Sequence, residues 1–136
     1  MAGSTRIDKL LSRRASRILF VALAVLVLAL SLIPRPESVL GSLSAYDKLG
    51  HFIAYVALGF FAMRAVDRRG PLPFALTIAG CAVLGGVIEI VQPFVGRQME
   101  LADFLVDLAG TAIGAAAAAL LARRPRDEEK KGPLRR

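Results

Sequence analysis

The chain has 136 residues, of which 55% are hydrophobic, with a formal net charge of +7 and a mean hydropathy of +0.56. This length allows one domain, and the apolar fraction is too high for an ordinary soluble domain of this size. The positive charge does not indicate a nucleic-acid-binding protein, because the basic residues collect at the two ends and in one loop between apolar runs. The single cysteine, Cys81, excludes an internal disulfide and lies in an apolar run, where a buried inert thiol is expected.

A polar, basic amino-terminal segment, 1–17, precedes the first apolar run, 18–33. A signal peptide would have the same order of regions. The run is longer than the usual ~7–15 residues of a signal peptide's apolar region, and Pro34-Arg35-Pro36 follows it without a clear small-x-small cleavage site. The sequence therefore favours an uncleaved first transmembrane helix.

Three more apolar runs follow a short proline-containing loop, and together they form a core at 46–122. Transmembrane helices are expected at 49–66, 72–92 and 101–122, because each run is long enough to cross the apolar part of a bilayer. Pro93 and Gly96 mark the turn after the third run. The tail, 123–136, mixes both charges with two prolines and is expected to be a solvated, disordered segment.

The fold class that follows is all-α: an integral membrane four-helix bundle with both termini in the cytoplasm. With four spans, 15 of the 18 Lys and Arg residues fall on one side, and only Arg35, Lys48 and Arg97 fall on the other. The positive-inside rule places the first side in the cytoplasm. We therefore expect a multi-pass protein of the bacterial cytoplasmic (inner) membrane, surrounded by membrane lipid, without a nucleic-acid partner.

Polar residues recur on the second and fourth helices at helical spacing. Asp47, His51 and Tyr55 stand at i, i+4 and i+8, and Asp103 and Asp107 stand four residues apart. Gly110 and Gly114 continue the second stripe and would allow close helix packing, as Ala82 and Gly86 would on the third helix. The topology brings these residues to the outer leaflet, the deepest of them only ~9 Å into the membrane. The candidate polar site consists of Asp47, Lys48, His51, Tyr55, Glu89, Gln92, Arg97, Asp103 and Asp107.

Several of these residues also have structural explanations. Asp47 would serve as a helix N-cap, and Asp103 would oppose the positive end of its helix dipole. Glu100 would be a solvated loop charge. Glu89 lies near the carboxyl end of its helix, where negative charge is disfavoured, and a pair with Arg97 across the turn is its simplest structural explanation. Asp107 would repel Asp103 unless a cation, a shared proton or a metal separates them.

The chain resembles the VanZ-like family of small bacterial membrane proteins. The resemblance covers about residues 46–122 and rests on the following residues, in this order: Asp47-Lys48-x-x-His51-Phe52, Tyr55, Glu89-x-x-Gln92, Arg97, Asp103, Gly110 and Gly114. The chain departs from the family pattern at Met99-Glu100, where a serine is usual, and at Asp107, where an asparagine is frequent. The family's name comes from a protein associated with low-level resistance to teicoplanin-type glycopeptide antibiotics, so the resemblance implies a role in the cell envelope. It does not imply a mechanism, and a link to antibiotic resistance stays open.

The reading we favour is a binding protein that recognises an anionic lipid or a peptidoglycan precursor in the outer leaflet, with cations from Arg97, Lys48 and His51. A second is a hydrolase or transferase acting on a lipid-linked phosphate through a divalent cation. Its candidate metal ligands would be His51, Glu89, Asp103 and Asp107. The third reading is a structural subunit whose polar network only fixes helix packing. Transport is the weakest reading, because four spans without internal symmetry could form a transport path only as an oligomer.

Overall fold

The computed structural model describes residues 12–34, 40–66 and 70–122, with no side-chain description for residues 40–47, and this part of the chain is helical throughout apart from its turns. The elements are α2 (Arg13–Ser31), α3 (Leu40–Ala65), α4 (Pro71–Val91), the short 3-10 helix η2 (Gln92–Val95) and α5 (Leu101–Ala122). The expected all-α architecture is therefore confirmed.

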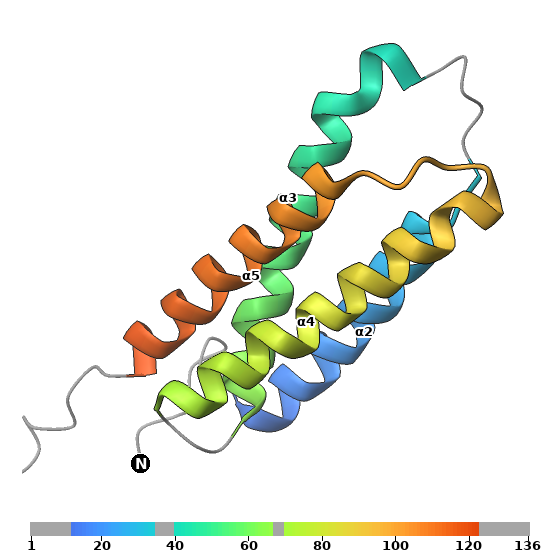
Figure 1. Cartoon of the computed structure of the whole chain (residues 1–136). Coiled ribbons are helices and arrows are strands. Elements are labelled where there is room, and N and C mark those ends of the chain that lie inside the picture. Colours follow the sequence, from blue (N-terminus) through green and yellow to red (C-terminus); the bar gives the residue numbers. More distant parts are fainter. Residues whose placement is uncertain (1–11, 35–39, 67–69, 123–136) are drawn as a thin grey trace, which may run out of the picture.

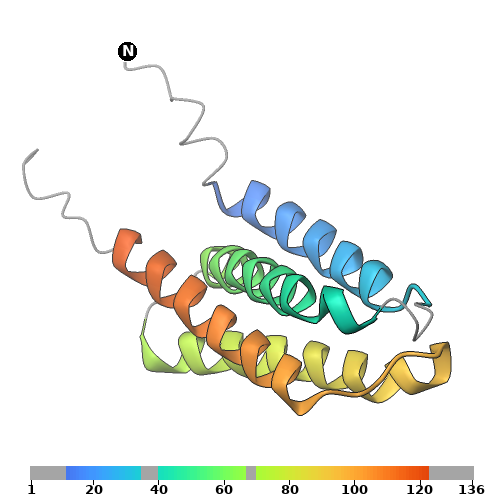
Figure 2. The same ribbon diagram turned by 90° about the horizontal axis from the view of Figure 1, so that it is seen from above.

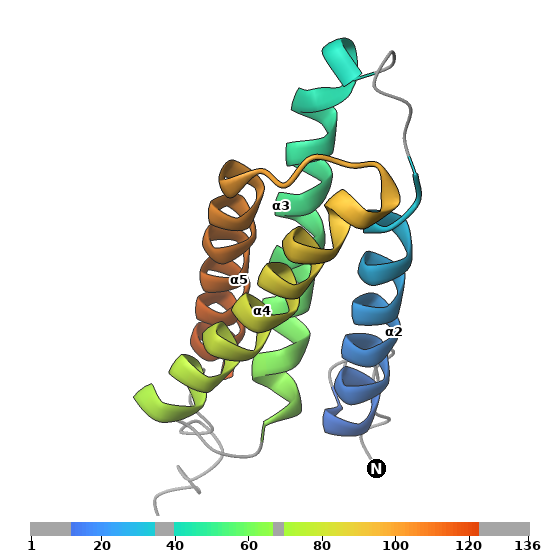
Figure 3. The same ribbon diagram turned by 45° about the vertical axis from the view of Figure 1, so that its right-hand side comes forward.

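The four long helices form a bundle in which α3 is central (Figure 1). Helix α3 packs most extensively against α5 and also contacts α2 and α4, while α4 packs against α5. Seen from above, α2 lies on one side of α3, and α4 lies on the other (Figure 2). The first turns of α3 extend beyond the other helices at the end where α4 connects to α5 (Figure 3).

Three helical segments of the described chain are long and apolar enough to cross a membrane: Arg13–Ser31, Pro71–Val95 and Leu101–Ala122. Many of their large apolar side chains point out of the bundle, such as Ile18, Leu76 and Leu105. Lipid solvates such side chains without cost. The protein is therefore a multi-pass membrane protein, and the expected fourth span, 49–66 in α3, remains a prediction.

The helix starts differ from the expected ones. Helix α2 begins at Arg13 rather than at residue 18, because the Ser12 side chain caps it by accepting the Ala15 backbone N–H at 3.2 Å. Helix α3 begins at Leu40, so Asp47 lies inside it and is not its N-cap. The side chain of Asp47 itself lies outside the described residues.

The turn at Pro93 and Gly96 is as the sequence predicts. Pro93 lies in the first turn of η2, and Gly96 ends it with φ +74°, a left-handed conformation that glycine adopts without strain. Gly70, with φ +129°, precedes Pro71 at the start of α4. These two glycines set the ends of α4 and η2.

Glycines bring the backbones of α3 and α5 into contact. A Cβ atom on Gly110 would lie 2.7 Å from the Phe52 carbonyl oxygen, and one on Gly114 would overlap the Val56 carbonyl oxygen. Gly59 of α3 lies in the same way against the Thr111 carbonyl oxygen. The predicted role of Gly110 and Gly114 in packing therefore agrees with their position. On α4 a Cβ on Gly86 would meet only Phe104, at 3.7 Å, so that residue makes no comparable backbone approach.

We expect Gly114→Ala to destabilise the bundle by about 1–3 kcal/mol, because the new methyl group meets backbone that moves only if α3 and α5 separate. Thermal unfolding in detergent, followed by circular dichroism, measures this. Gly80→Ala is the matched control, since a Cβ at Gly80 meets nothing within 4 Å. Equal melting temperatures for the two variants would contradict the close α3–α5 packing.

Candidate functional site

The structure gathers the predicted polar residues at one end of the bundle, where α2 and α4 end and α5 begins. Helix α3 supplies Lys48, His51 and Tyr55, and α5 supplies Asp103 and Asp107. Glu89 lies near the end of α4, Gln92 begins η2, and Arg97 lies in the following loop. Apart from Asp47, whose side chain is not described, every candidate residue is placed at this end.

Each buried aspartate of α5 faces its own partner on α3. Lys48 Nζ lies 3.1 Å from Asp103 Oδ1 and 2.5 Å from Glu100 Oε2. One turn along both helices, His51 Nδ1 lies 3.1 Å from Asp107 Oδ1, and both side chains are buried. Each carboxylate thus faces a basic group of α3, which reduces the cost of the repulsion expected between aspartates at i and i+4.

Glu89 finds its partner on the backbone of the next helix. Its Oε2 accepts the Glu100 backbone N–H at 2.8 Å, immediately before α5 begins at Leu101. Glu89 is only 4% exposed, and it lies near the negative end of its own helix dipole. The positive end of α5, with its N–H donors, compensates both the cost of burying this carboxylate and its unfavourable position in the dipole of α4. This contact gives Glu89 a structural role, and its pairing with Arg97 stays a prediction.

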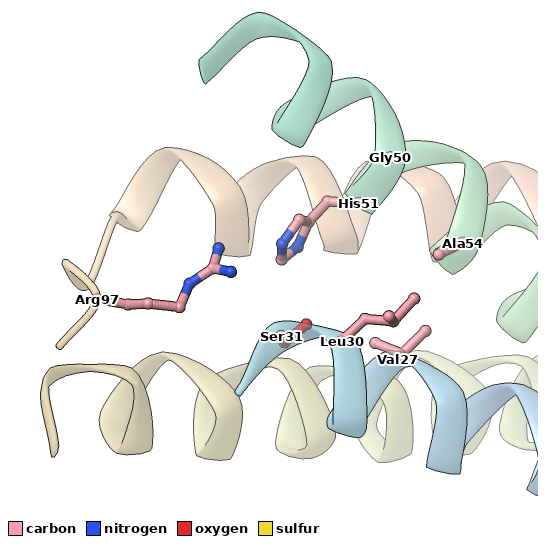
Figure 4. A pocket seen from close by; sticks show the side chains of 7 residues that line it. All are labelled: Val27, Leu30, Ser31, Gly50, His51, Ala54 and Arg97. Atoms are coloured by element: carbon pink, nitrogen blue, oxygen red, sulfur yellow. The ribbon is translucent and has the colours of Figure 1, made fainter. Parts of the chain in front are cut away.

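A cavity of about 160 Å³ opens between α2 and α3 at this end (Figure 4). The Arg97 guanidinium and the His51 ring point into it from the loop and from α3. The wall on α2 consists of Val27, Leu30 and Ser31, and Gly50 and Ala54 complete the wall on α3. Two basic groups and a mainly apolar wall suit a molecule with an anionic group beside an apolar chain.

Gln92 and Tyr55 occupy the interior around this cavity. Gln92 is 1% exposed, and its Nε2 donates to the Ser31 carbonyl oxygen at 3.5 Å, which connects the end of α2 to η2. Tyr55 is fully buried one turn below His51, and their rings are parallel with centroids 6.5 Å apart. Gln92 therefore has a packing role, and Tyr55 lies too deep to line the cavity.

The candidate metal ligands do not form a metal site in the described residues. No three His, Cys, Asp or Glu side chains of these segments are grouped so that they would hold a metal ion. His51, Glu89, Asp103 and Asp107 belong instead to the separate contacts described above. The geometry thus gives no support to a divalent metal centre built from these four residues.

Three residues of this region were not among the predicted candidates. Glu100, which was expected to be a solvated charge, is 44% exposed but also pairs with Lys48, and its backbone N–H donates to Glu89. Ser31 lines the cavity from α2, and Gly85 lies against Asp107 and Tyr55. Glu100 was detectable from the sequence, because it is the residue immediately before the fourth span, where an acidic group meets the positive end of a helix. The sequence around Ser31 and Gly85 gave no comparable indication of their positions.

We expect Lys48→Met to lower the free energy of unfolding by about 1–3 kcal/mol, because it leaves the buried Asp103 carboxylate without this cation. The loss is smaller than for a fully buried pair, since the Lys48 side chain is 32% exposed. Circular dichroism melting in detergent suits a chain without tryptophan. Adding Asp103→Asn should recover most of the loss, and a double variant as unstable as Lys48→Met would contradict the pairing.

Comparison with known protein families supports the resemblance to VanZ-like proteins. The sequence model of the VanZ/LLP1 family matches residues 11–122. This match extends beyond the core at 46–122 to include α2, which forms one wall of the cavity. No curated protein and no solved structure matches the chain.

Proposed function

This chain belongs to the VanZ/LLP1 family, and from that membership and the cavity between α2 and α3 we propose that it recognises an anionic lipid or lipid-linked cell-wall precursor in the bacterial cytoplasmic membrane. The observation that carries the proposal is the convergence of Arg97 and His51 on a cavity whose other walls are largely apolar. A phosphate group beside an acyl or prenyl chain has the matching chemistry. An arginine fork is well suited to phosphate oxygens.

The acidic residues of the region do not oppose this reading. Asp103, Asp107 and Glu89 each face a basic side chain or a backbone N–H on another element. Their negative charge is thereby partly compensated within the bundle. An anion in the cavity then meets Arg97 and His51 first, on the α2 side of α3.

The proposal also includes the orientation of the bundle in the membrane. We place both termini in the cytoplasm and the cavity in the outer leaflet, because the basic residues are concentrated at the termini and in the loop after α3. Helix α3 then crosses the membrane as the fourth span. Its position between α2 and α4 supports this, since these helices pack against two of its sides.

Alkaline phosphatase fusions test the orientation, because this enzyme is active only outside the cytoplasm. A fusion after Gly96, in the loop between η2 and α5, should be active, and a fusion at the carboxyl terminus should be inactive. The reverse pattern would place the cavity in the inner leaflet and would contradict this part of the proposal.

Arg97→Gln and His51→Gln should each weaken retention of anionic lipid by about tenfold, because each removes a charge-assisted contact worth about 1.5 kcal/mol or more. Native mass spectrometry of the protein from nanodiscs of mixed phosphatidylglycerol and phosphatidylcholine measures the enrichment. The control is Arg14→Gln, which removes an exposed arginine at the opposite end of α2. A wild-type protein without preference for phosphatidylglycerol, or equal retention by all variants, would count against lipid recognition.

The open question of a link to glycopeptide antibiotics extends the proposal to cell-wall precursors. A change in teicoplanin susceptibility on deletion of the gene, restored by the wild-type gene but not by Arg97→Gln, would support a precursor as the ligand. Unchanged susceptibility beside intact lipid binding would restrict the function to membrane lipids.

A further inference from the structure

The balance of charges at the polar end of the bundle indicates which kind of anion the cavity accepts. The described side chains there include four carboxylates and three basic groups. They are Glu89, Glu100, Asp103 and Asp107, with Lys48, His51 and Arg97. Lysine and arginine are cations at neutral pH, whereas His51 is one only when its ring carries a second proton. With these carboxylates ionised, the cations do not outnumber them, so the region has little capacity for further negative charge.

Lys48 does not contribute its charge to the cavity. Its Nζ lies 3.1 Å from Asp103 Oδ1 and 2.5 Å from Glu100 Oε2, and Lys48 is not among the residues that line the cavity. This cluster of one cation and two carboxylates has a net negative charge. The positive charge that a ligand meets therefore comes from Arg97 and His51, which do line the cavity.

Asp107 balances the charge of His51. The His51 and Asp107 side chains are 8% and 3% exposed, with 3.1 Å between Nδ1 and Oδ1. The fully buried Tyr55 hydrogen-bonds the same carboxylate through its hydroxyl group, so the carboxylate is held beside the imidazole ring. A protonated His51 forms a neutral pair with Asp107, and a neutral His51 leaves the pair negative. In either state the cavity wall has at most one net positive charge, that of Arg97.

The cavity wall changes from apolar to polar toward the end of the bundle. On α2, Val27 lies one helical turn deeper than Ser31. On α3, Ala54 lies one turn deeper than Gly50. A phosphodiester lipid has the same order of parts, with an apolar tail on one side of its phosphate and an alcohol on the other. The tail would lie along Val27 and Ala54, and the alcohol would lie toward the end of the bundle.

We propose that the cavity binds the singly charged phosphodiester of a membrane phospholipid, such as phosphatidylglycerol, in preference to lipids with a terminal phosphate or a diphosphate. This inference rests on the proposed function and narrows it to one class of ligand. The arginine fork donates to the two unesterified oxygens of a phosphodiester, and one negative charge matches one net positive charge. A second negative charge on the ligand is not balanced by the groups that line the cavity, and such a charge is costly in a membrane interior.

The test compares lipids that differ in the charge of the phosphate group. The full chain is placed in phosphatidylcholine nanodiscs with equal amounts of phosphatidylglycerol and phosphatidic acid that have identical acyl chains. At about pH 8.5 the phosphomonoester of phosphatidic acid has close to two negative charges, and the diester has one. Native mass spectrometry should show about tenfold higher retention of phosphatidylglycerol. The same preference is expected against undecaprenyl diphosphate, both with a chelator and with added magnesium.

A substitution at Gly50 separates charge from fit. Gly50→Lys adds a cation to the cavity wall, at a position where a Cβ atom meets nothing within 4 Å. It should raise the retention of phosphatidic acid relative to phosphatidylglycerol by about tenfold. Gly50→Gln is the matched control, because it adds a side chain of similar length without charge and should keep the wild-type preference. Both variants replace a helical glycine by a better helix former, and melting temperatures check that they fold.

Three results would overturn the proposal. Equal or higher retention of phosphatidic acid or undecaprenyl diphosphate by the wild-type protein would show that the cavity accepts a second charge, and the proposed recognition of anionic lipid would still stand. An unchanged preference in Gly50→Lys would show that charge does not determine the selection. Retention of none of the three anionic lipids above the level of phosphatidylcholine would contradict the proposed function as well, so the two failures are distinguishable.

Discussion

The backbone contact between α3 and α5 is the constraint on which the rest of the bundle depends. Gly110 and Gly114 allow the two helices to approach until their backbones touch at Phe52 and Val56. At that separation, the register of the two helices places Lys48 opposite Asp103 and His51 opposite Asp107. The polar contacts are therefore a consequence of the glycine contact, since wider separation would leave the carboxylates buried without partners.

The polar end of the bundle is stable because each buried acid has a partner on a different element. A membrane gives no water to solvate a carboxylate, so partners within the protein must do so. Asp103 and Asp107 pair with side chains of α3, whereas Glu89 accepts a hydrogen bond from the backbone just before α5. As a result, contacts of the three acids connect α3, α4 and α5 at one end of the bundle. The hydrogen bond from Gln92 to Ser31 connects α2 to the same end.

Much of this arrangement was predictable from the sequence, and the parts that were not predicted were missed for physical reasons. Helical spacing put Asp103, Asp107, Gly110 and Gly114 on one stripe, and a stripe that is both acidic and small-residue has to face a neighbouring helix. The backbone contact of Glu89 with Glu100 was not predicted, because side-chain patterns do not show backbone donors. Likewise, Gly85 resembles any other glycine of an apolar run until the helices are packed and two oxygens converge on it.

The His51–Asp107 pair connects the cavity to the packing of α3 against α5. His51 lines the cavity toward α2 and faces Asp107 of α5, with 3.1 Å between Nδ1 and Oδ1. Because Nδ1 is engaged by Asp107, the orientation of the imidazole at the cavity wall is set from α5. The same short contact that stabilises a buried aspartate in the membrane therefore also determines how the cavity presents one of its two basic groups.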